Sequence, residues 1–269
     1  MGRRPITGDG TNGVVSLTTY GRRLRTVHIA VESIAAGHLL PSAIILWVDA
    51  EQFELATRLP PLQRLRARGL ELRVADSELR SHKKYFHFVQ DPSLSAKPLV
   101  IADDDLLYPR TWYADLWDRF TQANGSAVIS AWVKRPGVAD GRLTPYESWP
   151  NATDTTLMRG NYFMGGSGTI FPIAFNGTLA AEGDRFLSIA PTSDDAWLNS
   201  RTHRAGLLVG QSTSESLPIR VIPGTQARTL GRENLGSSGT NWQLTRLYES
   251  EDLSHLARAD GSVGGDQPT

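Results

Sequence analysis

The sequence predicts an α/β protein with a mostly parallel sheet and helices on both of its faces. Short runs of β-branched and aliphatic residues alternate with segments of helical periodicity from residue 14 to residue 133. Several of these apolar runs end in Thr or Asp, and the carboxyl ends of parallel strands lie at one edge of a sheet. The composition, with 40% hydrophobic and 21% charged residues, is that of an ordinary globular protein.

Strands and helices are expected in alternation along this region. The apolar runs predict strands at residues 14–20, 43–48, 70–74, 98–102 and 127–133. Apolar side chains at helical spacing predict helices at residues 23–36, 51–68, 82–90 and 109–123. We expect Pro60 and Pro61 to interrupt the second helix, and Pro109 suits the first turn of the fourth.

Length and charge exclude several classes of protein. The 269 residues suffice for one large α/β domain or two small ones. Lys and Arg number 28, as do Asp and Glu, and this balance argues against nucleic acid as the main partner. The absence of cysteine excludes disulfides, thiolate catalysis and Cys-ligated zinc. No secretory signal and no transmembrane segment is recognisable, so we expect a cytoplasmic protein.

Three consecutive aspartates, Asp103, Asp104 and Asp105, follow the expected strand at 98–102 and are called the acidic run here. Adjacent carboxylates repel one another, and a divalent cation removes that penalty. Mg²⁺ and Mn²⁺ take oxygen ligands and commonly bridge one or two carboxylates to phosphates. Capping of the helix near Pro109 is the alternative, but three carboxylates exceed what one cap needs. The acidic run therefore predicts a metal–diphosphate site at the carboxyl end of a strand.

Two later motifs allow both a structural and a functional interpretation. The glycine loop, Gly165–Gly168, gives a ligand close access to backbone N–H groups, or it forms a tight turn. The acidic pair, Asp194 and Asp195, lies at an expected helix start that Thr192 or Ser193 would cap. One carboxylate of the pair could instead act as a general base toward an acceptor hydroxyl.

Other polar and aromatic residues carry the same ambiguity between a site and a surface or core position. Lys83, Lys84, Arg22 and Arg23 could neutralise a diphosphate or lie on solvated faces. Asp49 and Asp76 could bond to a base or a ribose, or serve as turn residues. The tryptophans could stack on sugar rings or pack in the core, and the four considered are Trp132, Trp149, Trp197 and Trp242.

The order of these motifs resembles that of bacterial GT-A-fold glycosyltransferases, closest to the family-2-like enzymes of capsule, O-antigen and cell-wall glycan assembly. The resemblance covers roughly residues 14–250. It is carried by Val15–Tyr20, Ile45–Asp49, His82–Tyr85, Ala102–Asp105, Gly165–Gly168 and Thr192–Leu198.

The resemblance implies one Rossmann-like GT-A catalytic domain at residues 13–250, with a nucleotide-binding half at 13–133 and a smaller, mixed acceptor-side half at 134–250. Residues 1–12 would be an N-terminal tail. Residues 259–269, rich in Gly, Ser, Asp and Pro, would be a disordered tail.

The resemblance also implies roles for single residues. The acidic run matches the family's D-x-D motif, with Asp105 as the main ligand of Mn²⁺ or Mg²⁺ and Asp103 near the metal or the ribose. The acidic pair matches the position of the catalytic base in inverting enzymes, and we assign that role to Asp195. Residues matching the nucleotide region are Thr18, Thr19, Tyr20, Arg22, Asp49 and Asp76. Residues matching the loop beside the sugar and the acceptor are Gly165, Gly166 and Ser167.

One departure concerns the metal. Many GT-A enzymes use a late histidine as a further ligand, and no residue matches it, since His255 lies near the tail and Asn241-Trp242 occupies the corresponding region. We therefore expect a metal held by few protein groups and bound well only with nucleotide present.

The resulting prediction is a metal-dependent glycosyltransferase. It would move a sugar from a nucleoside-diphosphate donor, with UDP favoured by the resemblance, to a hydroxyl of a glycan or lipid-linked glycan. Association with the inner face of the membrane through a partner or lipid acceptor stays open. A sugar nucleotidyltransferase is one alternative, disfavoured because residues 19–23 hold a single glycine. A non-catalytic nucleotide-sugar or glycan-binding protein is another, disfavoured by the acidic residues in both motifs.

Overall fold

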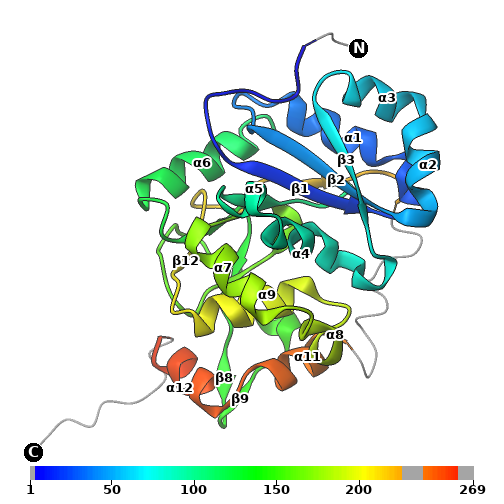
Figure 1. The fold of residues 1–269 in the computed structure, drawn as a ribbon. Coiled ribbons are helices and arrows are strands. Elements are labelled where there is room, and N and C mark those ends of the chain that lie inside the picture. Colours follow the sequence, from blue (N-terminus) through cyan, green and yellow to red (C-terminus); the bar gives the residue numbers. More distant parts are fainter. Residues whose placement is uncertain (1–3, 226–238, 260–269) are drawn as a thin grey trace, which may run out of the picture.

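The computed structural model describes residues 4–225 and 239–259, which are built around a seven-stranded sheet (Figure 1). Neighbouring strands are parallel except at β11, which is antiparallel to β4 and β6. The strands in spatial order are β12 (Val209–Gln211), β6 (Val128–Ser130), β11 (Thr169–Phe171), β4 (Leu99–Ile101), β1 (Val14–Thr19), β2 (Ala43–Asp49) and β3 (Leu70–Ala75). The expected α/β fold with a mostly parallel sheet is confirmed.

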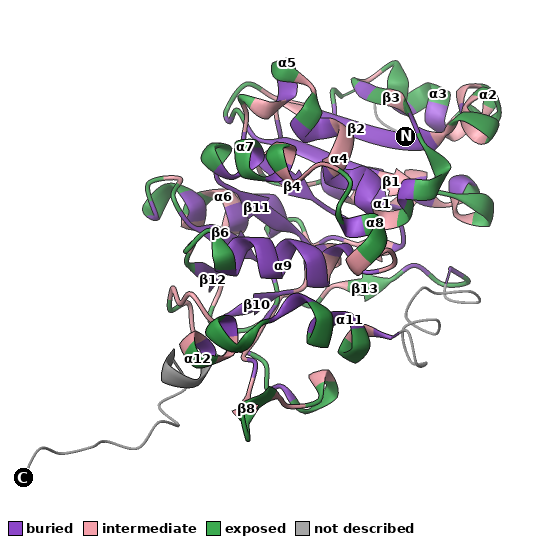
Figure 2. Ribbon diagram, turned by 60° about the horizontal axis from the view of Figure 1, so that its bottom comes forward, coloured by how far each residue is buried: buried purple, intermediate pink, exposed green. Residues whose placement is uncertain are grey.

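Alternate side chains of each central strand enter hydrophobic layers on opposite faces of the sheet. Val14 belongs to one buried cluster and Val15 to the other. The Val14 face is covered by α4 (Lys83–Gln90), α7 (Ile173–Glu182) and α9 (Asp194–Arg204). The Val15 face is covered by α1 (Val27–Ala35), α2 (Ala50–Arg58), α3 (Pro60–Arg66) and α6 (Trp112–Gln122). Figure 2 shows the central strands β4, β6 and β11 and the helix α9 almost wholly buried.

The remaining elements are short, and most lie in the second half of the chain. Three small antiparallel pairs are β5 (Leu106–Leu107) with β13 (Arg220–Val221), β7 (Val133–Lys134) with β10 (Tyr162–Phe163), and β8 (Val138–Ala139) with β9 (Arg142–Leu143). Further α-helices are α5 (Pro92–Ser95), α8 (Phe186–Ile189), α11 (Thr240–Leu247) and α12 (Ser250–Ala259). The 3₁₀ turns are η1 (Gly21–Arg25), η2 (Ser77–His82), η3 (Tyr146–Ser148) and η4 (Gly165–Ser167).

Several element boundaries differ from those expected. The break at Pro60 occurs as predicted, between α2 and α3. The helix expected from Pro109 begins instead at Trp112, after a turn closed by the bond from Trp112 N to Pro109 O. The strand expected at 127–133 ends at Ser130, and Val133 pairs with β10 in a different sheet.

The two ends of the described chain pack against the domain. Ile6, in the segment expected as a tail, is buried, and its N–H donates to the Arg68 carbonyl (3.0 Å). Leu256 in α12 is also buried, so the packed region continues past residue 250. Residues 260–269, expected to be disordered, lie outside the described residues. No helix among the described residues is long and apolar enough to cross a membrane.

The sheet order reverses next to β1, which lies between β2 and β4. In open α/β sheets ligands bind in the crevice beyond the carboxyl ends of the strands at such a point. The residues that follow β1 and β4 are therefore where a site is expected.

Candidate active site

The acidic run lies in that crevice, beside the end of β1. The Thr19 hydroxyl at the end of β1 donates to Asp104 Oδ2 (2.6 Å). Asp104 and Asp105 are only 4% and 6% exposed, so their side chains do not point into bulk solvent. Burial raises the pKa of Asp104, and burial followed by repulsion from Asp103 raises that of Asp105 to about 6.

Arg23 in η1 bridges the last two carboxylates of the acidic run. Its Nη1 lies 2.9 Å from Asp104 Oδ1, and its Nη2 lies 3.0 Å from Asp105 Oδ2. A planar guanidinium suits this two-pronged contact. Arg23 therefore already neutralises part of the charge that the sequence assigned to a metal.

Lys84, the second residue of α4, joins the acidic run to the acidic pair. Its Nζ lies 2.7 Å from Asp103 Oδ1 and 2.8 Å from Asp194 Oδ2. Burial alone would lower the pKa of Lys84, but the surrounding carboxylates raise it well above its usual value. Its neighbour Lys83 pairs with Asp49 at the end of β2. Both lysines thus contact carboxylates of the protein, where the sequence suggested a diphosphate.

The glycine loop lies between the acidic run and Asp195, and its contacts with these carboxylates require glycine at two of its positions. Gly165 N donates to Asp195 Oδ1 (3.0 Å). A Cβ on Gly165 would overlap the Asp195 carboxylate, and a Cβ on Gly166 would overlap that of Asp103. The Tyr108 hydroxyl fixes this arrangement, since it accepts from Asp103 N (2.7 Å) and donates to Gly166 O (2.8 Å).

The acidic pair begins α9, and its two members have different surroundings. Ser193 Oγ accepts from Ala196 N (3.2 Å), so the capping expected of Thr192 or Ser193 is confirmed for Ser193. Burial would raise the pKa of Asp194, but Lys84 holds it below its usual value. Asp195 is less buried, and burial followed by repulsion from Asp194 raises its pKa well above the usual range. Neighbouring carboxyls whose pKa values are pushed apart are typical of acid–base sites.

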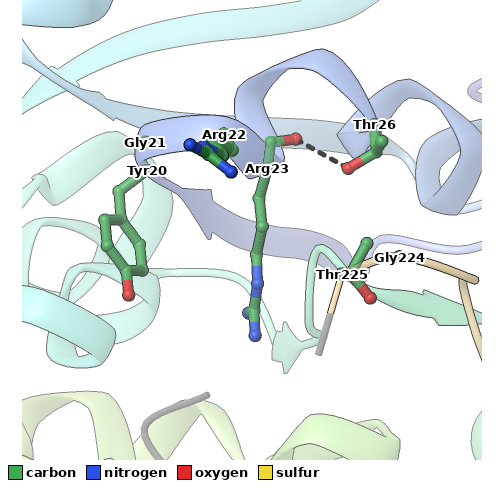
Figure 3. A pocket seen from close by; sticks show the side chains of 7 residues that line it. All are labelled: Tyr20, Gly21, Arg22, Arg23, Thr26, Gly224 and Thr225. Atoms are coloured by element: carbon green, nitrogen blue, oxygen red, sulfur yellow. Dashed lines mark hydrogen bonds between the residues drawn. The ribbon is translucent and has the colours of Figure 1, made fainter. Parts of the chain in front are cut away.

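A cavity of about 410 Å³ opens beside Arg23, the residue that bridges the last two carboxylates of the acidic run (Figure 3). Arg23 contributes to its wall, as does Tyr20, which is 46% exposed. The full set of lining residues is Tyr20, Gly21, Arg22, Arg23, Thr26, Gly224 and Thr225. Two of the residues assigned to the nucleotide, Tyr20 and Arg22, thus lie at one hollow.

Three residues that the sequence analysis assigned to the site have side chains in other surroundings. Thr18 Oγ1 donates to the Trp47 carbonyl (3.1 Å), and Ser167 Oγ donates to the Met164 carbonyl (2.7 Å), so both hydroxyls support the backbone. Asp76 follows the edge strand β3 with its side chain 79% exposed, 3.8 Å from His87 Nε2. The structure does not bring Asp76 together with the acidic run.

The acidic residues could hold a metal ion only if a bound ligand supplied further coordinating atoms. No group of three or more His, Asp or Glu side chains in residues 4–225 and 239–259 is arranged to hold a metal ion. The acidic run and acidic pair contribute five carboxyls, against two cations, Arg23 and Lys84. Mg²⁺ is commonly held by one or two carboxylates plus phosphates and water. This excess of acid fits such a cation at Asp103 and Asp105, completed by a diphosphate.

Two aromatic residues next to the glycine loop were not assigned to the site from the sequence. Trp132 is 36% exposed, its indole Nε1 donates to Asn151 Oδ1 (2.9 Å), and its carbonyl accepts from Met164 N (2.9 Å). The Tyr146 hydroxyl donates to Met164 Sδ (2.9 Å), and burial, then Asp195, raises its pKa. Trp132 had been considered for sugar stacking, but no motif in the sequence distinguishes Tyr146.

The sequence also gave no reason to separate Arg23 from Arg22. Only Arg22 was assigned to the nucleotide, yet Arg23 forms the ion pairs with the acidic run. The late residues considered for the metal lie elsewhere. His255 in α12 packs near His203, and Asn241 in α11 bonds to Tyr146 N (2.8 Å).

Comparisons with known proteins give a likeness in structure only. No protein-family model and no curated protein matches the sequence. The chain is similar to residues 1–349 of TarS from S. aureus, with a TM-score of 0.51 and 11% identity over 76% of this chain and 59% of that one. TarS 1–349 in complex with UDP gives a TM-score of 0.49 and 10% identity over 76% and 59% of the two chains.

A third similar structure is 4-diphosphocytidyl-2C-methyl-D-erythritol synthase from Anaerococcus prevotii. Its TM-score is 0.49, with 11% identity over 81% of this chain and 95% of that one. Because the chain spans 59% of the TarS fragment at 11% identity, that likeness shows the fold alone. The fold is Rossmann-like and of the GT-A type, as the sequence predicted.

Proposed function

We propose that this protein is a glycosyltransferase that uses a nucleoside-diphosphate sugar, with UDP as the favoured nucleotide. The observation that carries the proposal is the convergence of three motifs at one crevice. The acidic run, the glycine loop and the acidic pair come from distant parts of the chain and are joined there through Lys84 and Asp195. A site with a metal-type acidic run and a separate carboxyl of raised pKa suits transfer from a diphosphate leaving group to a hydroxyl.

The donor would bind across the cavity and the acidic run. Tyr20 offers an aromatic face for a base, and Arg22 and Arg23 offer guanidinium groups for phosphates. Asp103 and Asp105 would hold Mn²⁺ or Mg²⁺. When bound, the cation would supply Lewis-acid stabilisation of the departing diphosphate.

Asp195 would act on the acceptor, which is a hydroxyl of a glycan or lipid-linked glycan. Its carboxylate is oriented by the N–H of Gly165 and has no described cation within ion-pair distance, in contrast to Asp194. A raised pKa makes it the better proton acceptor of the two. The hydroxyl oxygen attacks the anomeric carbon, its proton passes to Asp195, and the bond to the diphosphate breaks, with inversion.

The acceptor would lie along the aromatic residues beside the glycine loop. Trp132 presents a partly exposed indole fixed by Asn151, and Tyr146 lies near Asp195. Aromatic faces pack well against the C–H surfaces of sugar rings. Peripheral association with a membrane through a lipid-linked acceptor is part of this proposal.

Binding and turnover of donors test the proposal. Thermal shifts with a panel of nucleoside diphosphates and their sugars should show stabilisation by one nucleotide, larger with Mn²⁺, and the matching sugar donor should hydrolyse slowly. Asp105→Asn should abolish the effect of Mn²⁺ on nucleotide binding. Release of pyrophosphate from a nucleoside triphosphate and a sugar phosphate would instead show a nucleotidyltransferase. Nucleotide binding without any turnover would favour a binding protein.

Asp195→Asn tests the assignment of the base. Asparagine keeps an oxygen for the Gly165 N–H but cannot take a proton, so turnover should fall by about 10²- to 10⁴-fold. Nucleotide affinity, measured by calorimetry, should stay within about twofold of the wild type because the donor site is untouched. Retained turnover would contradict the role of Asp195 and would point to another base or to a retaining reaction.

A further inference from the structure

Arg23 occupies Asp105, one of the two carboxylates that a donor-bound metal would need. Its two terminal nitrogens lie 2.9 and 3.0 Å from Asp104 and Asp105, and its side chain is 19% exposed. A guanidinium and a divalent cation at the same carboxylate repel each other strongly, because like charges a few ångströms apart interact through a poorly screened medium. Arg23 and a metal therefore compete for Asp105.

Arg23 also borders an open cavity. Arg23 lines the cavity of about 410 Å³, and Figure 3 shows its side chain extending along that hollow from η1. Its backbone is anchored, since the Arg23 carbonyl accepts from Thr26 N (2.8 Å) and Thr26 Oγ1 (3.1 Å). The guanidinium can thus change partner by side-chain rotation alone.

A diphosphate in the cavity is a suitable second partner. Phosphate oxygens accept the same two-pronged contact from a guanidinium that carboxylates do. Moving Arg23 from the acidic run to the diphosphate would take one positive charge away from Asp105 at the moment when the diphosphate supplies further metal ligands.

We propose that Arg23 is an exchangeable internal cation that makes metal binding depend on the donor. Without a nucleotide, Arg23 pairs with Asp104 and Asp105 and lowers the affinity of the site for the metal ion. With a nucleoside diphosphate it turns to the phosphates, and Asp105 takes the metal. The proposal rests on the proposed donor site and adds to it a residue that sets the order of binding. Because coupling is reciprocal, the metal strengthens nucleotide binding by the same factor.

The test measures Mn²⁺ binding, from the electron-spin-resonance signal of free Mn²⁺, with and without UDP. In the wild type UDP should raise the affinity for Mn²⁺ by about 10- to 100-fold. Arg23→Gln should bind Mn²⁺ alone about 10-fold more tightly than the wild type, since the competing cation is gone. The same variant should bind UDP in EDTA about 10-fold more weakly, because a charged contact to phosphate is lost. A variant that is merely misfolded would bind both Mn²⁺ and UDP more weakly than the wild type.

Two further variants separate the effect of losing a charge anywhere in η1 from the effect of losing the guanidinium at Arg23. Arg25→Gln removes the same charge from η1, but Arg25 is exposed and makes no ion pair with the described residues, so both affinities should stay at wild-type values. Arg23→Lys keeps one charge without the two-pronged geometry and should lie between wild type and Arg23→Gln. If Arg23→Gln does not fold, the wild type and Arg23→Lys still decide the matter.

Each outcome is distinguishable from failure of the proposed function. Equal Mn²⁺ affinity of the wild type with and without UDP would overturn the exchange while leaving donor binding intact. Unchanged affinity for Mn²⁺ alone in both Arg23 variants would overturn the role of Arg23. A wild type that binds UDP but no Mn²⁺ in either state would contradict the metal dependence, and one that binds no nucleotide would contradict the proposed function.

Discussion

The acidic run is neutralised by different cations at its two ends. Arg23 bridges its last two carboxylates from a 3₁₀ turn at the rim of a cavity, with 19% of its side chain exposed. Lys84 contacts its first carboxylate from α4, with 4% of its side chain exposed, and also reaches Asp194 in α9. Both residues look like solvated basic side chains in the sequence. The difference in burial and in the number of elements joined favours Lys84 as the residue that holds the site together and Arg23 as the one that would exchange partners.

Removing Lys84 should therefore cost the most stability. Lys84→Met would leave Asp103 and Asp194 without their buried counter-ion, and breaking such a pair typically costs about 3–5 kcal/mol. Urea unfolding should show this loss, whereas Arg23→Gln should cost less because the Arg23 side chain is itself nearer to solvent than that of Lys84, 19% against 4% exposed.

A second change checks the cause. Asp194→Asn in the Lys84→Met background should restore part of the lost stability, since it removes one of the two uncompensated charges. Equal stability of Lys84→Met and the wild type would contradict the role given to Lys84 and would remove the contrast with Arg23.

The Lys84 end of the site should also be the more sensitive to acid, through His82. The buried His82 ring has one nitrogen 2.9 Å from the Ala190 carbonyl and the other 3.1 Å from the Tyr85 hydroxyl, and it stacks on Phe186 at 4.0 Å. Its pKa is lowered from 6.5 to about 4, mainly by burial and to a smaller extent by Lys84, against the opposing effects of Asp194 and the Ala190 carbonyl. His82 is therefore neutral in the folded protein at pH 7.

The direction in which pH changes the free energy of unfolding follows from the lowered pKa of His82. Below pH 6.5 the unfolded chain takes up a proton that the folded protein does not, so stability is full above pH 6.5 and falls toward pH 4, by about 3 kcal/mol. His82→Gln retains a donor for the Ala190 carbonyl but does not titrate. Its stability, measured by urea unfolding across this range, should fall less than that of the wild type, and parallel curves would contradict the assignment.

The sequence predicted the sheet and the meeting of its polar strand ends because both depend on local patterns. Apolar runs ending in Thr19 and in the acidic run indicate parallel strands whose polar ends meet, and the Thr19–Asp104 hydrogen bond is that meeting. The partners of the cations could not be predicted in this way. Lys84 and Asp194 are 110 positions apart, and which of two adjacent arginines faces the acidic run depends on the 3₁₀ geometry of η1. For the same reason the sequence does not distinguish a strand-terminal Asp on an edge strand from one beside the acidic run, and the assignment of Asp76 to the nucleotide stays a prediction.

A substitution in the glycine loop has the smallest expected effect on stability. It also tests most directly how closely the loop contacts the acidic run. Gly166→Ala places a Cβ where the Asp103 carboxylate lies, so either the loop or Asp103 must shift, at a cost of about 1–3 kcal/mol. Gly177→Ala in α7 is the matched control, because a Cβ there meets nothing within 4 Å and should stabilise the helix by about 0.5–1 kcal/mol. Opposite signs in thermal unfolding would support the close contact between loop and acidic run. Two stabilising substitutions would mean that Asp103 is not held against the loop, and the bridge from Lys84 to the acidic run would then lose its fixed geometry.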